Sequence, residues 1–259
     1  MGLADREYYR SEPRGVSPIA AMRMWSITTW LIAINVAVFI LNGMFRRVVT
    51  VTDGVQTWRQ DAGGLLEIWG HFSVATAIFH GQIWRFITFQ FLHAGLWHLL
   101  LNMLGLFFFG PLIERYLGTK RFLAFYLLCG IAGPIGYMIL WAASNTTGVE
   151  LLMSAAYWLV GASAGVFGIL IAAAHLAPNA TVLVYGIIPM RMRVLALALL
   201  GIAVYHIFVT GQNAGGEAAH LAGAAAGFLL IRNPRWLNFA EMRLPRSRGR
   251  NLDYKRWRD

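Results

Sequence analysis

Gly161-Ala162-Ser163-Ala164-Gly165 opens an apolar stretch that runs to Ala177 without a Lys, Arg, Asp or Glu. Such a stretch indicates a membrane helix, and it places a serine hydroxyl inside the hydrocarbon layer. A second apolar stretch begins 57 residues further on, where Ala219-His220-Leu221-Ala222-Gly223 carries a histidine. A polar side chain at that depth is costly unless it has a partner. The two stretches therefore predict a serine and a histidine that meet within a membrane.

The composition of the whole chain agrees with a membrane location. Hydrophobic residues make up 58% of the 259 residues, charged residues only 13%, and the mean hydropathy is +0.55. A soluble domain typically carries about 25% charged residues. The net charge of +10 comes from tails and loops between apolar runs, where it sets topology and contacts membrane lipids. This pattern does not suggest a nucleic-acid partner.

Six apolar stretches are candidate membrane spans, which predicts an all-α membrane protein with six transmembrane helices. They cover residues 27–44, 98–112, 122–143, 162–177, 194–209 and 218–231. The fourth and sixth are shorter than the roughly 20 residues that a bilayer usually requires. We expect these two short helices to begin below the membrane surface, which would bring Ser163 and His220 to a submerged position.

The Lys and Arg residues predict the orientation of the spans. They occur in the N-terminal tail, in the second and fourth connections and in the C-terminal tail, whereas the third and fifth connections have none. The first connection carries four, but it is about fifty residues long, and long loops weigh little in the positive-inside rule. Both termini are therefore expected inside (N-in/C-in).

This orientation divides the chain into three predicted parts. Residues 1–25 form a charged cytoplasmic tail, 26–232 the membrane domain, and 233–259 a basic cytoplasmic tail. The N-terminal tail has no signal-peptide layout, so the first span is expected to be retained. Twenty arginines against two lysines are typical of a GC-rich bacterial genome, and so the expected location is a bacterial plasma membrane, with several passes through it.

Four polar residues fall at a similar depth on the outer side, because the second, fourth and sixth spans all begin there. They are His98, Asn102, Ser163 and His220. A serine hydroxyl is a weak nucleophile until a base takes its proton, and a neutral imidazole suits that task near pH 7. Asn102 shares a helix face with His98, and a side-chain amide can donate a hydrogen bond to an oxyanion. The set predicts nucleophilic catalysis by serine.

Several motifs in this order resemble the rhomboid family of intramembrane serine proteases. They are His93-x4-His98-x3-Asn102, Gly-x-Ser at residues 161–163, and Ala-His-x-x-Gly at residues 219–223. Trp84-Arg85 is similar to an element of the family's long first loop, and the segment 110–118 to the family's connection between the second and third helices. The resemblance covers about residues 26–232. Ala164 departs from it, since most members place glycine directly after the serine.

The resemblance implies a role for each matching residue. Ser163 would be the nucleophile and His220 the general base, while His98, Asn102 and the backbone N–H of Ser163 would form the oxyanion hole. Trp84 and Arg85 would anchor the first loop. Glu114 would belong to a hydrogen-bond network on the inner side. The substrates implied are single-pass transmembrane proteins, cut within their membrane segments.

The surroundings of His220 predict a two-member catalytic dyad rather than a triad. Glu217 is the nearest acidic residue in the sequence, and it is expected at the outer end of the same helix, out of position to orient the imidazole. Packing must then orient the ring, and Phe167, one turn after Ser163, could lie against it. Small residues at four-residue spacing would let the two helices approach closely. They are Gly161, Gly165 and Gly168 on one helix and Ala219, Gly223 and Gly227 on the other.

Two other classes of protein remain open at this point. A six-span haem or metal protein could use His98 and His220 as ligands, but the chain has no His-Glu-x-x-His pattern, and Ser163 and Asn102 would then have no role. A catalytically inactive rhomboid-like protein that binds membrane proteins, or controls their quality, is the closer alternative. Such proteins usually lose the serine or the histidine, and this chain has both. We therefore expect a protease without metal or cofactor.

Overall fold

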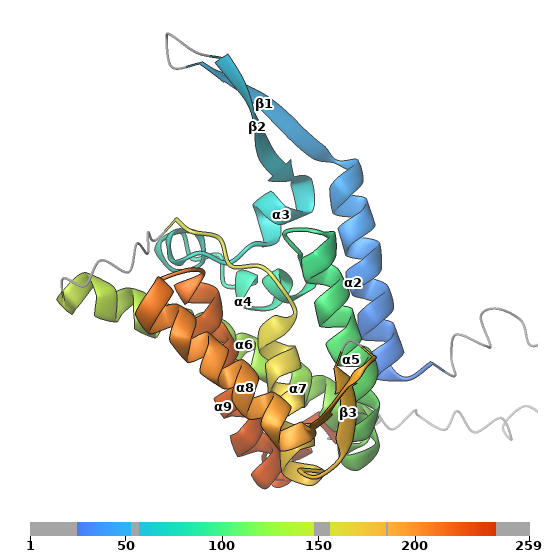
Figure 1. Ribbon diagram of the computed structural model, residues 1–259. Coiled ribbons are helices and arrows are strands. Elements are labelled where there is room, and N and C mark those ends of the chain that lie inside the picture. The colour runs from blue at the N-terminus through green and yellow to red at the C-terminus, as the bar shows by residue number, and fades with distance from the viewer. Residues whose placement is uncertain (1–24, 53–56, 148–155, 185, 242–259) are drawn as a thin grey trace, which may run out of the picture.

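The computed structural model describes residues 25–52, 57–147, 156–184 and 186–241 (Figure 1). The predicted tails lie largely outside this part of the chain. A helix occupies each of the six predicted spans: α2 (Ile27–Met44), α5 (Leu96–Leu117), α6 (Thr119–Thr147), α7 (Ser163–Leu176), α8 (Met192–Tyr205) with the π-helical turn η4 (His206–Thr210), and α9 (Ala214–Arg232). Five of the six are long and apolar enough to cross a membrane. The exception is α7, with 14 residues.

The connections contain structure that an all-α prediction does not include. β1 (Arg46–Thr52) and β2 (Thr57–Gly64) form an antiparallel hairpin that projects beyond the end of α2 (Figure 1). A second hairpin, β3 (Thr181–Val184) with β4 (Ile188–Arg191), joins α7 to α8. Both hairpins contain runs of β-branched residues, which suit a strand better than a helix. Strands of this length are much shorter than the apolar stretches that indicate membrane spans.

Short helical segments complete the long first loop and the C-terminal end. The loop contains α3 (Leu65–Gly70), η2 (Ala75–Phe79), α4 (Arg85–Thr88) and η3 (Phe89–Phe91). After α9, the 3-10 segment η5 (Pro234–Glu241) contacts α6 and buries Leu237 in the main core. The ordered helical domain therefore continues past residue 232.

Helix α7 lies at the centre of the molecule (yellow in Figure 1) and contacts α5, α6, α8 and α9. The residues around it form the main hydrophobic core, in which Leu106, Phe125, Tyr126 and Ile169 are completely buried. Helix α2 lies at the periphery and packs mainly on α5. Because α7 is short and surrounded by other helices, its first residue, Ser163, lies among these helices.

Glycines bring the backbones of α7 and α9 into direct contact. A Cβ atom on Gly227 would lie 2.5 Å from the Cα of Gly168, and one on Gly223 would meet the carbonyl oxygen of Ala164. The methyl group of Ala164 fits on its other side, because α6 presents Gly133, whose added Cβ would lie 2.8 Å from it. Alanine after the serine is therefore accommodated by a glycine on the neighbouring helix.

Glu114 joins α5 to α2. Its carboxylate accepts hydrogen bonds from the backbone N–H groups of Ile27 (2.8 Å) and Thr28 (3.0 Å) and from the Thr28 hydroxyl (2.7 Å). These N–H groups belong to the first turn of α2, where no intrahelical acceptor exists. An anion also suits the positive end of a helix dipole. Glu114 thus caps α2 from the neighbouring helix.

The glycine contacts predict that Gly223→Ala destabilises the protein. The added methyl group would meet backbone atoms of α7, which cannot move aside as a flexible side chain could. Overpacking of this kind costs about 1–3 kcal/mol, and each kcal/mol lowers Tm by about 2–4 °C in a chain of this size. Thermal unfolding in detergent measures the effect.

Gly201→Ala is the matched control. Gly201 is an exposed residue of α8, and nothing lies within 4 Å of an added Cβ. Its Tm should stay the same or rise, because alanine favours helix more than glycine does. Equal Tm values for the two variants would contradict the proposed backbone contact.

Candidate active site

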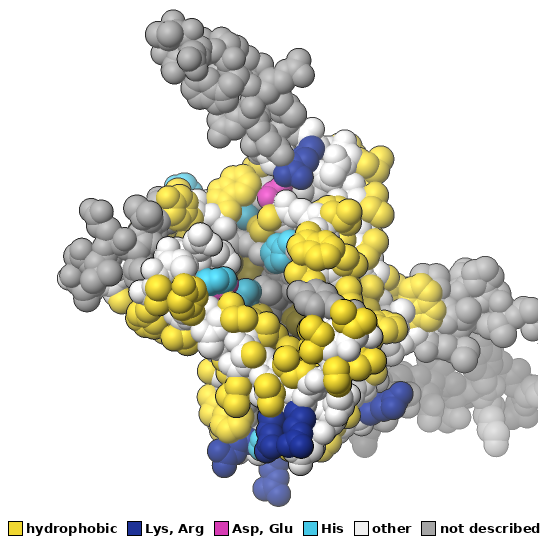
Figure 2. Space-filling view, viewed as in Figure 1, with side chains coloured by type: hydrophobic (Ala, Val, Ile, Leu, Met, Phe, Trp, Pro, Cys, Tyr) yellow, Lys and Arg dark blue, Asp and Glu magenta, His cyan; other side chains and the backbone are white. Residues whose placement is uncertain are grey.

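Ser163 and His220 meet at the ends of two adjacent helices. Ser163 is the first residue of α7, and His220 lies in the second turn of α9. The Ser163 Oγ is 2.8 Å from His220 Nε2, which is a hydrogen bond. Both side chains are partly buried. Figure 2 shows histidine side chains gathered around a hollow on this face of the molecule.

Phe167 lies against the imidazole of His220. The two rings are stacked, with centroids 4.4 Å apart and planes 6° from parallel. Because Phe167 follows Ser163 by one helical turn, both side chains point toward α9. The contact fixes the plane of the imidazole beside the serine hydroxyl.

The expectation that no carboxylate can orient His220 is wrong. Oε2 of Glu217 lies 2.9 Å from His220 Nδ1, and Oε1 lies 3.2 Å from Nδ1 of His206 in η4. The Glu217 side chain is buried, with 12% of its surface exposed. Residues three apart in a helix share a face, and the Glu217 side chain therefore reaches the imidazole of His220.

His98 lies beside the backbone that leads into Ser163. A Cβ on Gly161 would be 2.7 Å from His98 Nε2, and Gly161 has φ +131°, a conformation that favours glycine. The Gly161 N–H donates to the carbonyl of Phe89 (2.9 Å). Asn102 is buried one turn further along α5, where its Nδ2 donates to the carbonyl of His98 (2.9 Å). His98 is thus next to the serine loop, while the Asn102 amide is bonded within its own helix.

The N-terminus of α7 supplies further donors around the serine. The first backbone N–H groups of a helix have no intrahelical acceptor, and the helix dipole favours negative charge there. The N-cap residue Ala162 has no side chain that could occupy them. An anion formed next to Ser163 would therefore be stabilised by this helix end.

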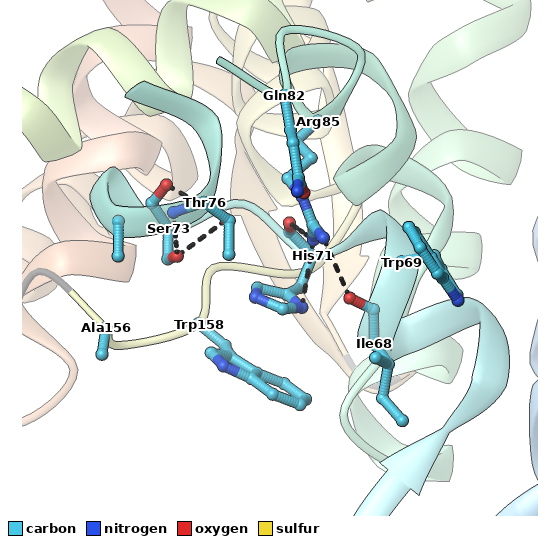
Figure 3. A pocket seen from close by; sticks show the side chains of 10 residues that line it. Ile68, Trp69, His71, Ser73, Thr76, Gln82, Arg85, Ala156 and Trp158 are labelled. Carbon is cyan, nitrogen blue, oxygen red and sulfur yellow. Dashed lines mark hydrogen bonds between the residues drawn. The ribbon is translucent and has the colours of Figure 1, made fainter. Parts of the chain in front are cut away.

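Arg85 anchors the first loop (Figure 3). Arg85 is 3% exposed, and its guanidinium donates to the backbone carbonyls of His71 (2.6 Å) and Ile68 (3.0 Å). Trp84 lies at the surface with 46% exposure and donates from Nε1 to the carbonyl of Trp69 (3.3 Å). Arg85 therefore bonds to backbone groups inside the loop, whereas Trp84 bonds to the backbone at the surface of the loop.

The first loop is tied to the segment that leads into α7. Phe72 and Leu159 exchange two backbone hydrogen bonds of 3.0 and 2.7 Å. Trp158 stacks on His71 at a centroid distance of 4.0 Å, beside an apolar cavity of about 400 Å³ in the loop (Figure 3). The residues that line this cavity do not include Ser163 or His220. The loop's contribution to the site is to position the backbone before Ser163.

Two buried histidines of this region are held neutral. Burial lowers the pKa of His71 from 6.5 to about 4, and the nearby Arg85 charge acts in the same direction. Burial likewise lowers the pKa of His93 to about 3, with a further contribution from His98. The ring of His93 lies edge-on to that of His98, with centroids 5.1 Å apart. Both side chains therefore act as uncharged packing groups near pH 7.

Fold and site together define a helical membrane protein with a serine–histidine pair within its helical core. The family model described as the Rhomboid domain matches residues 80–233, which is more than half of the chain. The chain therefore belongs to the rhomboid family. Membership makes it an integral membrane protein of the class that carries out intramembrane proteolysis.

Individual relatives show how far the similarity extends. YdcA of Bacillus subtilis is 29% identical over 209 residues, which cover 81% of this chain and 88% of YdcA. The rhomboid protease GluP of the same organism is 32% identical over 58% of this chain and 27% of its own length. The mitochondrial RHOMBOID-like protein 12 of Arabidopsis thaliana is 32% identical over 56% of this chain and 44% of its own length. The chain thus matches only part of some relatives.

One relative is named as inactive. Inactive RHOMBOID-like protein 8 of Arabidopsis thaliana is 41% identical over 54 residues, or 21% of this chain and 15% of that protein. Family membership alone consequently does not decide whether a member cleaves. The arrangement of individual side chains must carry that argument.

The lowered pKa values predict a loss of stability in acid. Below pH 6.5 the unfolded chain protonates His71 and His93, while the folded protein does not until about pH 4 and 3. The unfolded state then binds more protons, so the free energy of unfolding falls as the pH drops from 6.5 to 4. We expect Tm in detergent to fall across this window, and His93→Gln to reduce the slope.

His80→Gln is the control for this experiment, since His80 is an exposed histidine of the same loop. Its slope should match that of the unmodified protein. Parallel slopes for all three proteins would contradict a contribution from His93.

Proposed function

We propose that the protein is a serine endopeptidase that cleaves single-pass transmembrane proteins within their membrane segments. The observation that carries this proposal is the 2.8 Å hydrogen bond between Ser163 Oγ and His220 Nε2, at the start of a helix surrounded by four others. Both side chains retain partial exposure, so a peptide can reach them. Membership of the rhomboid family supports the same class of reaction.

The reaction follows from the positions of these atoms. Ser163 Oγ attacks the carbonyl carbon of the scissile peptide bond while its proton passes to His220 Nε2. The C–N bond then breaks, and the imidazolium returns that proton to the leaving amine. Water hydrolyses the acyl-serine ester by the same route, with His220 again as the base.

The negative oxygen of the tetrahedral intermediate requires donors. In our proposal these are the backbone N–H of Ser163, at the free end of α7, together with the side chains of His98 and Asn102. The short distance between His98 and Gly161 supports the role of His98 as an oxyanion donor. The Asn102 amide nitrogen carries two N–H donors, and only one is needed for the bond to the His98 carbonyl, so in our proposal the other serves the oxyanion. Preorganised donors of this kind stabilise charge as it develops.

The proposed orientation is N-in/C-in in a plasma membrane, with a bacterial source favoured by the arginine-rich composition. Figure 2 shows a cluster of Lys and Arg side chains at the end of the molecule opposite the histidines that surround the hollow. Such a distribution suits a cytoplasmic side at that end. The serine and histidine would then lie toward the outer leaflet, where the membrane segments of substrates begin.

One prediction of this proposal concerns the proposed nucleophile and base. Ser163→Ala and His220→Ala should each abolish cleavage of a transmembrane substrate in liposomes while leaving Tm in detergent within a few degrees. The double variant should be no worse than either single one, because nucleophile and base act as a unit. A fluorophosphonate probe should label Ser163 in the unmodified protein.

The alternatives predict different results. An inactive, binding-only rhomboid protein would retain a transmembrane partner without cleaving it and would not react with the probe. A metal-dependent protein would lose activity in chelators. Among the described residues, no group of three or more His, Cys, Asp or Glu side chains is arranged to hold a metal ion. Turnover retained in Ser163→Ala would reject the serine mechanism.

A further prediction of this proposal tests the oxyanion donors. Asn102→Ala should lower kcat without abolishing it, since loss of one such donor typically costs about 10²–10³ in rate. Labelling by the fluorophosphonate should become slower but remain complete. Asn145→Ala is a suitable control, because Asn145 is an exposed amide bonded to the carbonyl of Trp141 in α6. Full activity of Asn102→Ala on several substrates would remove Asn102 from the proposal.

A further inference from the structure

Glu217 is the point at which two imidazoles from different elements meet. One carboxylate oxygen faces Nδ1 of His220 on α9, and the other faces Nδ1 of His206 in η4. Within the described residues, no other carboxylate comes within ion-pair distance of either ring. A buried carboxylate is costly unless each of its oxygens has a donor. The two imidazoles supply these donors.

The carboxylate decides which nitrogen of His220 carries the proton. An ionised carboxylate only accepts hydrogen bonds, so the nitrogen that faces it must carry hydrogen. The neutral ring then has its proton on Nδ1, which leaves Nε2 free to accept from Ser163. This is the tautomer that a general base in this position needs.

The carboxylate also restricts a motion that ring stacking leaves free. Phe167 is nearly parallel to the imidazole, at a centroid distance of 4.4 Å. Stacking fixes the plane of a ring, but rotation within that plane changes the stacking area very little. The bond from Nδ1 to Glu217 opposes such rotation and directs Nε2 at the serine. Phe167 and Glu217 therefore constrain different degrees of freedom.

We propose that Glu217 is a positioning residue for the general base, and that His206 holds Glu217 in place from the adjacent helix. The proposal rests on the serine-protease function proposed above. Glu217 stays ionised throughout: the serine proton moves only to His220 Nε2, and the imidazolium donates from Nδ1 to the carboxylate before Nε2 releases the proton to the leaving amine. Ser163, His220 and Glu217 thus form a triad.

His206 connects this triad to the end of α8. It begins the π-helical turn η4 (His206–Thr210), which interrupts the regular α8 hydrogen bonding just where the side chain turns toward Glu217. Single π-helical turns often occur at functional sites because they redirect a side chain. The position of α8 is in this way coupled to the geometry of the base.

The decisive variant is Glu217→Gln, measured in the full-length protein reconstituted in liposomes. An amide can donate to Nδ1 and so favour the tautomer with hydrogen on Nε2, which cannot accept the serine proton. We expect kcat to fall about 10²-fold or more, by analogy with the amide substitution in a Ser-His-Asp triad, with KM nearly unchanged. The rate of fluorophosphonate labelling at Ser163 should fall in parallel.

Glu217→Asp retains the carboxylate, so its kcat should be at least about tenfold higher than that of Glu217→Gln. This is expected of a group that acts through its charge and acceptor oxygens. His206→Phe should lower kcat by less than Glu217→Gln does. Glu241→Gln is the matched control, because Glu241 is a half-exposed carboxylate paired with Arg121 at the other end of the molecule. Its kcat and KM should not change.

Three results would overturn the proposal. A kcat for Glu217→Gln within about threefold of the unmodified protein would show that packing alone orients the base. Equal losses in Glu217→Asp and Glu217→Gln, accompanied by equal falls in Tm, would assign Glu217 a structural role. Failure of the unmodified protein to react with the probe would reject the serine-protease function itself. This outcome differs from the first two because it is observed without any Glu217 variant.

Discussion

Backbone contact between α7 and α9 is the constraint on which the site depends. Gly168 and Gly227 leave no space for a Cβ between the helices, and Gly223 lies against the carbonyl of Ala164. A serine and a histidine on these helices meet only at this separation, since the bond of 2.8 Å between them would be lost beyond about 3.5 Å. Larger residues at the contact would force the helices apart by more than this margin. Close packing of small residues is also how membrane helices associate without a hydrophobic drive.

Two buried charged groups elsewhere in the molecule are satisfied by neighbouring segments of the chain. Glu114 of α5 accepts from the first turn of α2, and Arg85 donates to carbonyls of the first loop. In lipid an unsatisfied group would cost several kcal/mol. These bonds therefore determine where peripheral elements sit. Through the Phe72–Leu159 pairing, the first loop in turn sets the backbone that enters α7.

The site combines neutral and charged side chains at close range. Burial keeps His71 and His93 uncharged, so they add no positive charge to this region at neutral pH. Glu217 is the charged member, and it lies on the side of His220 away from Ser163. In the proposed mechanism, a negative charge in that position would stabilise the imidazolium without competing for the serine proton. One relative bears a name that calls it inactive, so family membership alone does not decide whether this chemistry takes place.

The amino-acid sequence was enough to predict where the apolar helices lie and that Phe167 shares a face with Ser163. Hydrophobic periodicity and spacing contain this information, because they fix the depth and face of each residue on its own helix. The contacts of Glu217 with His220 and His206, and the space that Gly133 leaves for Ala164, could be seen only in the folded protein. These outcomes depend on side-chain rotamers and on distances between helices far apart in the chain, which no local pattern specifies.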